Sequence, residues 1–204
     1  METQNTSTYA ENLRQHKEQR RAEMLRVAAE VFAENGLRKT TMDHVAKRLG
    51  VSKIVLYRYF GSKSNLIHAV LQRIVDLILE EDLKPVDWWG TRIHRNIALA
   101  RKNADAFLLL LHHAAHDPEF GIHYTQFQQT LVERTEARLR QIMNKPVRRP
   151  VDTTFCAQSI CTFILDSAMR WLETGDPEDD ELFVTWMIDS IQAWGERWQE
   201  SSSP

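Results

Sequence analysis

A short run of the sequence, VSKIVLYRYFGSK over residues 51–63, sets basic side chains among aromatic and β-branched ones. Lysine and arginine donate hydrogen bonds to phosphate oxygens and to guanine, and tyrosine hydroxyls donate to phosphates. Lys53, Arg58, Lys63 and two tyrosines in this run therefore have the chemistry to contact a polyanion. Whether these groups share one surface depends on the secondary structure of the run.

The run is predicted to be a short helix, although its aromatic and β-branched residues favour strands by propensity. Val51, Leu56 and Phe60 recur at helical spacings and form an inward face, and Ser52 is a suitable N-cap. The basic groups and the tyrosines then lie on the outward face. An α-helix of this kind fits the major groove of DNA.

A second short helix is predicted just before it, in TTMDHVAKRLG. Thr40 and Asp43 resemble a capping box, and Gly50 ends the helix. A helix, a glycine-containing turn and a second helix make the helix-turn-helix arrangement.

The rest of the chain is also predicted to be helical, because few glycines and prolines interrupt its apolar periodicity. We expect an all-α protein of about nine helices, with an N-terminal three-helix helix-turn-helix domain and a helical C-terminal domain. The expected divisions are a disordered tail over 1–11, the helix-turn-helix domain with a connecting helix over 12–81, the second domain over 82–199, and a disordered tail over 200–204.

Charge is distributed unevenly along the chain. Residues 10–75 hold thirteen basic and six acidic side chains, a balance of +7, and the remainder carries −9 because the whole chain is −2. A basic first third indicates that this part meets a polyanion. No apolar run approaches 18 residues and the N-terminal segment is polar, so we expect a cytoplasmic protein that does not enter a membrane. Cys156 and Cys161 are expected to be buried thiols.

The segment AAEVFAENGLRKTTMDHVAKRLGVSKIVLYRYFGSKSNLI resembles the N-terminal domain of TetR-family transcriptional repressors. The resemblance runs from about residue 22 to 75 and includes the threonine pair, the Gly50-Val51 turn, the Tyr57-x-Tyr59-Phe60 core and Lys63. It implies a homodimer that binds a palindromic DNA operator. The set of DNA-binding residues that we expect is Thr40, Thr41, Ser52, Lys53, Ile54, Val55, Tyr57, Arg58, Tyr59 and Lys63.

The resemblance also implies a repressor that a small, hydrophobic ligand releases from DNA. Candidate ligand contacts are Trp88, Trp89, Ile93, Phe107, Leu111, His112, His116, Tyr124 and Phe127. The last two helices carry large apolar groups on more than one side, which favours a four-helix interface with a second subunit. Candidate interface residues are Phe155, Ser159, Phe163, Phe183, Trp186, Met187, Ser190 and Trp194. An activator, or a regulator without a small-molecule ligand, remains an alternative.

Four histidines cluster in LLLLHHAAHDPEFGIHY, and His112 and His116 are one helical turn apart. That spacing can bind a metal ion, so a metal-binding or enzymatic protein using the segment from His112 to His123 is the remote alternative. The segment lacks the glutamate of an H-E-x-x-H motif, and the chain has no G-x-S-x-G, P-loop or G-x-G-x-x-G motif. We therefore assign no catalytic residue, metal ligand or cofactor.

Overall fold

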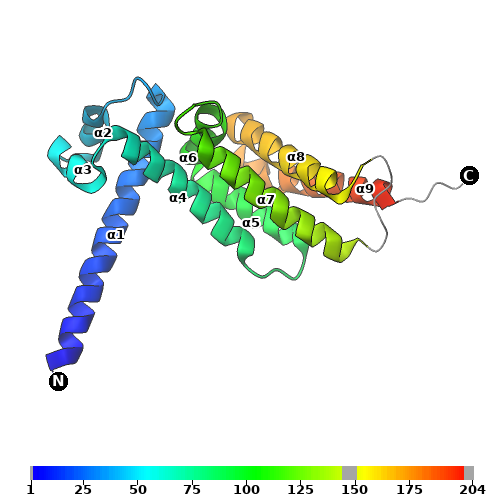
Figure 1. The fold of residues 1–204 in the computed structure, drawn as a ribbon, viewed down its shortest axis with the longest axis horizontal. Coiled ribbons are helices and arrows are strands. Elements are labelled where there is room, and N and C mark those ends of the chain that lie inside the picture. The colour runs from blue at the N-terminus through cyan, green and yellow to red at the C-terminus, as the bar shows by residue number, and fades with distance from the viewer. Residues whose placement is uncertain (1, 144–150, 200–204) are drawn as a thin grey trace, which may run out of the picture. The chain divides into compact units, whose positions relative to one another are not determined.

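The computed structural model describes residues 2–143 and 151–199, and every regular element in these ranges is helical (Figure 1). The all-α prediction is thus confirmed. The expected tail over 200–204 lies outside the described residues. The chain divides after Arg73 into two compact units, eight residues earlier than the predicted boundary after residue 81.

The first unit contains α1 (Glu2–Asn35), α2 (Met42–Leu49), α3 (Lys53–Phe60) and the first half of α4 (Lys63–Leu83). Its core is made of large apolar groups from all four helices. The side chains that it buries completely or almost so are Leu25, Phe32, Val45, Leu56 and Leu66. Gly50 closes α2 with a φ of 65°, a left-handed conformation that glycine adopts without steric cost.

Helix α1 begins at Glu2, although the sequence analysis assigns residues 1–11 to a disordered tail. No glycine or proline occurs between Glu2 and Asn35, so nothing breaks the helix toward its N-terminal end. Residues 11–20 are exposed throughout, and this part of α1 extends beyond α2 and α3 (Figure 1).

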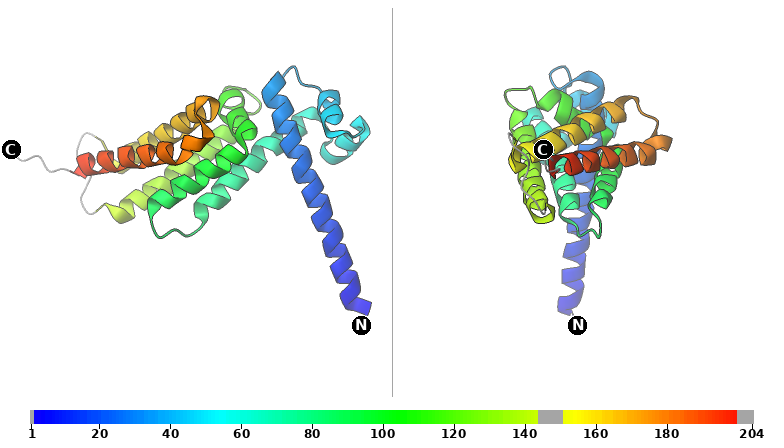
Figure 2. Two further views of the ribbon diagram at one scale, coloured as in Figure 1. Left: turned by 180° about the vertical axis from the view of Figure 1, so that it is seen from behind. Right: turned by 90° about the vertical axis from the view of Figure 1, so that its right-hand side faces the viewer.

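The second unit continues α4 and adds six further helical segments and one short turn. They are α5 (Trp89–Lys102), α6 (Ala104–Leu108), the π-helical η1 (Leu109–Ala114), α7 (Gly121–Ile142), α8 (Thr153–Thr174), the 3₁₀ turn η2 (Pro177–Asp179) and α9 (Asp180–Gln199). Helix α7 packs on α8, and α5 packs on α9. Figure 2 shows α8 and α9 side by side, and the rings of Phe163 and Trp194 join them at a centroid distance of 4.8 Å.

Two helix boundaries in this unit are set by local structure. The backbone changes at Leu109 from the α geometry of α6 to the π geometry of η1. Helix α7 begins only at Gly121, because the Asp117 side chain accepts hydrogen bonds from the N–H groups of Glu119 and Phe120 and holds a turn there. Within the described residues no helix is both long and apolar enough to span a membrane.

Candidate nucleic-acid interface and ligand cavity

Helix α3 is held in the first unit by two of the three predicted inward residues, whereas Val51 precedes the helix and is only partly buried. Leu56 and Phe60 are buried, and the guanidinium of Arg21 on α1 lies over the Phe60 ring, 5.6 Å from its centroid. Ser52 occupies the N-cap position, but its side chain makes no capping hydrogen bond. Burial of two large side chains therefore positions this helix, with no contribution from a side-chain N-cap.

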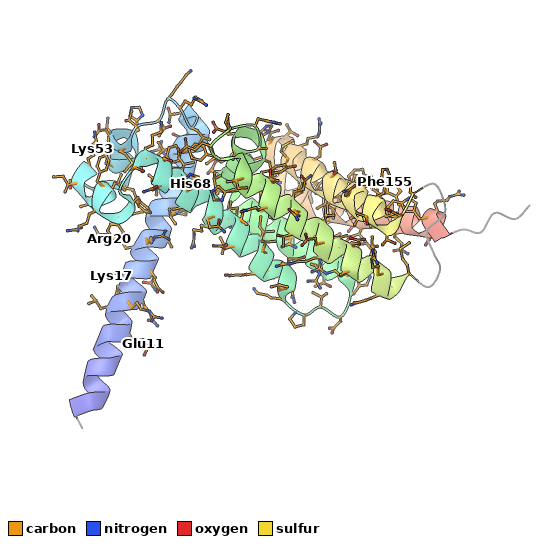
Figure 3. The ribbon with its side chains drawn as sticks, in the orientation of Figure 1. Glu11, Lys17, Arg20, Lys53, His68 and Phe155 are labelled. Atoms are coloured by element: carbon orange, nitrogen blue, oxygen red, sulfur yellow. The ribbon has the colours of Figure 1, made fainter. Side chains whose placement is uncertain are left out.

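The outward face of α3 combines apolar, aromatic and basic groups. Ile54 is 78% exposed, and Ser52, Lys53, Tyr57 and Arg58 are exposed around it. Figure 3 labels Lys53, at the start of this helix. Val55 and Tyr59, also predicted to face outward, are only partly exposed. An exposed isoleucine between cations can contact a thymine methyl in a major groove.

Lys53 is already paired in the free protein. Its Nζ donates to Asp43 Oδ2 at 2.7 Å and lies 6.0 Å from the centroid of the Tyr57 ring. The hydrogen bond with Asp43 raises the pKa of Lys53, so the lysine is fully charged at neutral pH. A guanine or phosphate that binds Lys53 must compete with the Asp43 carboxylate.

The two threonines before α2 have different roles, and the sequence analysis misassigned one of them. Thr41, not Thr40, is the N-cap: its hydroxyl accepts from the His44 N–H, and His44 Nδ1 accepts from the Thr41 N–H. Thr40 is 0% exposed, and its hydroxyl donates to the carbonyl of Gly36 at 2.8 Å. Thr40 is therefore not placed to contact a phosphate, whereas the exposed Thr41 is. Thr41 directly precedes the first apolar residue of α2, which was the sequence signal for this cap.

Lys63 is the first residue of α4 and is half-buried. Its Nζ donates to the Arg38 carbonyl at 3.0 Å, which holds the ammonium beside the loop between α1 and α2. Ser62 caps this helix by accepting from the Asn65 N–H at 3.0 Å. A cation and free backbone N–H groups at one helix start are suited to binding a phosphate.

The second unit contains a cavity of about 360 Å³ that is partly open to solvent and within the size range of ligand pockets. Four of the nine predicted ligand contacts line it: Trp89, Ile93, Phe107 and Phe127. Most of its other lining is apolar, and α7 and α8 together contribute the largest share. These α7 and α8 residues, which the sequence analysis missed, include Leu131, Leu139, Ile160, Ile164, Leu165 and Ala168.

The other five predicted contacts lie away from this cavity lining. Trp88, His112 and His116 are exposed, Leu111 is buried in the core, and Tyr124 is partly buried. Burial raises the pKa of Tyr124, so its hydroxyl stays protonated at neutral pH. The position of a residue in the chain and its type do not indicate the face of the helix on which its side chain lies.

A polar group at one end of the cavity was also missed. Asp82 of α4, only 3% exposed, accepts hydrogen bonds from Arg134 and from both Nη atoms of Arg138. Arg92 of α5 also lines the cavity and lies within ion-pair distance of Asp82.

The outer surface of α8 and α9 is rich in aromatic groups. Phe155, labelled in Figure 3, and Leu182 are exposed, and Trp186 is 53% exposed. Phe163 contacts both Trp186 and Trp194. Met187, one of the predicted interface residues, is 0% exposed and belongs to the core of its own subunit.

The histidine segment forms no metal centre within the part of the chain that the structure describes. No group of three or more histidine, cysteine, aspartate or glutamate side chains there is arranged to hold a metal ion. His112 Nε2 lies 2.6 Å from Glu173 Oε1, and His123 is buried. Cys156 and Cys161 are buried free thiols, as predicted, and burial raises the pKa of both.

These features define a class of protein: an all-helical molecule whose first unit is a helix-turn-helix DNA-binding domain and whose second unit contains a largely apolar cavity. Comparison with known proteins supports the assignment of the first unit as a DNA-binding domain. Residues 24–70 match the model of the family described as bacterial regulatory proteins, tetR family. The first unit thus carries a DNA-binding domain of the kind found in TetR-family transcriptional regulators.

Curated relatives match over a short part of the chain. The transcriptional activator FasR of Mycolicibacterium smegmatis is 50% identical over 60 residues, which are 29% of this chain and 27% of that protein. The transcriptional repressor KstR2 of Rhodococcus jostii is 40% identical over 60 residues, 29% of each chain. The match thus spans little more than a quarter of these relatives.

Solved structures extend the likeness of the fold to most of the chain. A transcriptional regulator from Aquifex aeolicus superposes with a TM-score of 0.72 at 16% identity, over 85% of this chain and 98% of that one. AibR, solved in complex with isovaleryl coenzyme A and operator DNA, gives a TM-score of 0.63 at 20% identity, over 84% and 97%. At such identities the likeness concerns the fold alone.

Proposed function

We propose that this protein is a repressor that binds a palindromic operator as a homodimer and leaves it when a small, largely apolar ligand fills the cavity. The observation that carries the proposal is the outward face of α3, where the 78% exposed Ile54 lies among Lys53, Tyr57 and Arg58. Apolar and basic groups on one exposed helix suit thymine methyls, guanine edges and phosphates together.

One helix of eight residues contacts too few bases to select a single operator. A two-fold dimer doubles the contacts and requires half-sites about one helical turn apart. The α8–α9 surface supports the pairing, because Phe155, Leu182 and Trp186 expose large apolar groups that a second copy would bury. We place Ser159 and Ser190 at the same surface as small residues that allow close approach.

Selection of bound DNA from a random pool tests the proposed function. We expect recovery of a palindrome with two half-sites, and recovery of sequences without two-fold symmetry would contradict the dimer. Ile54→Ala should relax preference at one position of each half-site while leaving the fold intact, since this side chain is exposed. Val132→Ala on α7, a partly buried apolar position in the other unit, is the control and should leave the selected sequence unchanged.

Analytical ultracentrifugation tests the proposed dimer directly. Trp186→Glu should convert a dimer to a monomer at micromolar concentration, because it places two like charges in an apolar contact. Ile122→Glu, at an exposed apolar position on α7, is the matched control and should remain dimeric. A wild-type protein that sediments as a monomer would refute the assignment.

The alternative function is activation of transcription. FasR is an activator and KstR2 a repressor, and both share this DNA-binding domain. The sign of regulation depends on where the operator lies relative to the promoter. A reporter fused to the selected operator decides between them: expression falls on adding a repressor and rises on adding an activator.

A further inference from the structure

The cavity of the second unit changes from polar to apolar along its length. On α5 the lining runs from Arg92 and Asn96 to Ala100, and on α7 it runs from Arg138 to the fully buried Phe127. With a rise of 1.5 Å per residue, the eleven residues from Arg138 to Phe127 span about 16 Å. The cavity therefore has a cationic end and a long apolar end.

Three arginines meet at one buried carboxylate, and two of them, Arg92 and Arg138, line the cationic end of the cavity. Arg134 and Arg138 donate to the carboxylate of Asp82, and Arg92 donates to its backbone carbonyl and to that of Lys84. The carbonyls at the C-terminal end of α4 contribute a partial negative charge. One carboxylate and one helix end do not balance three guanidinium groups. Glu196, the other carboxylate among the lining residues described, is exposed on α9.

Two observations indicate a missing partner at this end. The pKa of Arg92 is lowered, first by burial and then by repulsion from Arg138, so its charge lacks full compensation. Asn96 lies one turn along the same helix. Its Oδ1 is buried, and within the described residues it has no hydrogen-bond partner. A buried amide oxygen without a partner costs free energy that a ligand donor would recover.

We propose that the cavity binds an apolar chain with an anionic head and a hydroxyl or amide N–H close to that head. The head pairs with Arg92 and Arg138, the donor group reaches Asn96 Oδ1, and the chain extends toward Phe127. This inference rests on the proposed function of the cavity as the effector site. The head is either a free carboxylate or the phosphate of a thioester carrier, since a guanidinium binds both.

Calorimetric titration of the full-length protein tests the ligand class. The probes are decanoate, 3-hydroxydecanoate, decanoyl coenzyme A and decanol. We expect decanoate to bind roughly ten- to a hundredfold more tightly than decanol, as a charge-assisted hydrogen bond would give. Equal binding of decanol would overturn the proposal. Stronger binding of decanoyl coenzyme A than of decanoate would assign the head to phosphate, and the reverse order to carboxylate.

Variants separate recognition from folding. Arg92→Gln should lower the affinity for decanoate by about tenfold or more and leave the affinity for decanol unchanged. Arg95→Gln is the matched control, because this arginine is exposed on the same helix, donates to the Pro85 carbonyl and does not line the cavity. Asn96→Leu should abolish the preference for 3-hydroxydecanoate over decanoate. Loss of both anionic and neutral ligands in Arg92→Gln, with Arg95→Gln unaffected, would show a structural role for Arg92 and contradict the proposal.

A gel shift with the selected operator distinguishes this inference from the proposed function. Release of DNA by decanoate and not by decanol supports both the effector role of the cavity and the anionic head of the ligand. Binding of decanoate without any change in DNA affinity leaves the ligand class standing and refutes effector control. Release of DNA by decanol as effectively as by decanoate supports effector control and refutes the anionic head.

Discussion

Lys53 Nζ lies 2.7 Å from Asp43 Oδ2, so the first residue of α3 is ion-paired with the first turn of α2. Both side chains are exposed, and the pair itself contributes little to stability. The ion pair instead affects DNA binding. The Asp43 carboxylate accepts a hydrogen bond from the Lys53 ammonium, which could otherwise bind a guanine or a phosphate. The same carboxylate places a negative charge at the edge of the expected DNA interface.

Asp43→Asn should therefore strengthen operator binding roughly two- to fivefold, by releasing Lys53 from an exposed pair. Fluorescence anisotropy at fixed salt measures the change. Glu34→Gln is the matched control, because it removes the carboxylate of another exposed pair in the same unit, with Arg48 at 2.6 Å. If both variants bind equally more tightly, the effect is one of net charge and the specific role of Asp43 is wrong.

Lys63→Ala should weaken binding to all DNA sequences to a similar extent. A lysine that neutralises a phosphate releases a counterion, so the slope of log affinity against log salt should fall by about one. Affinities measured at several salt concentrations give this slope. Lys102→Ala, at an exposed lysine in the other unit, should leave the slope unchanged. A change in base preference at a single operator position would instead make Lys63 a base contact.

Local patterns predicted the first unit better than the second. Leu56 and Phe60 are buried where their helical spacing puts them, although propensity favours a strand. That success follows from short-range periodicity. Arg134 and Arg138, by contrast, meet Asp82 across more than fifty residues of sequence. No local sequence pattern shows which helix surfaces come together in the folded protein. The cationic end of the cavity was therefore not predictable from one sequence.

The two threonines before α2 should separate stability from DNA binding. Thr40→Val removes a buried hydroxyl that donates to the Gly36 carbonyl and should cost about 1–3 kcal/mol of stability, because this carbonyl then keeps only the Thr40 backbone N–H as a donor. Thr41→Ala removes the N-cap and should cost about 1 kcal/mol, with an added loss of operator affinity. Urea unfolding and anisotropy on the same samples measure both. Loss of affinity in Thr40→Val without loss of stability would restore Thr40 as a DNA contact.

Asp180 should make the second unit sensitive to acid. Arg101 donates to both of its carboxylate oxygens, at 3.0 and 2.7 Å, and Trp171 Nε1 donates at 2.7 Å. The hydrogen bonds from Arg101 are the main cause of the lowered pKa of Asp180. Because the folded pKa lies below the unfolded one, the stabilisation is complete above about pH 4 and is lost as pH falls through the folded pKa.

Asp180→Asn should accordingly lower the free energy of unfolding by about 1–3 kcal/mol at pH 7, where the carboxylate is charged. The difference from wild type should shrink toward zero once the pH lies below the folded pKa, because Asp180 is then protonated in both states. Denaturant unfolding across this pH range measures it. Asp166→Asn, which removes an exposed pair with Arg170 on α8, should have an effect below about 1 kcal/mol at any pH. A destabilisation by Asp180→Asn that persists unchanged in acid would mean that packing around Trp171, and not the charge, stabilises the start of α9.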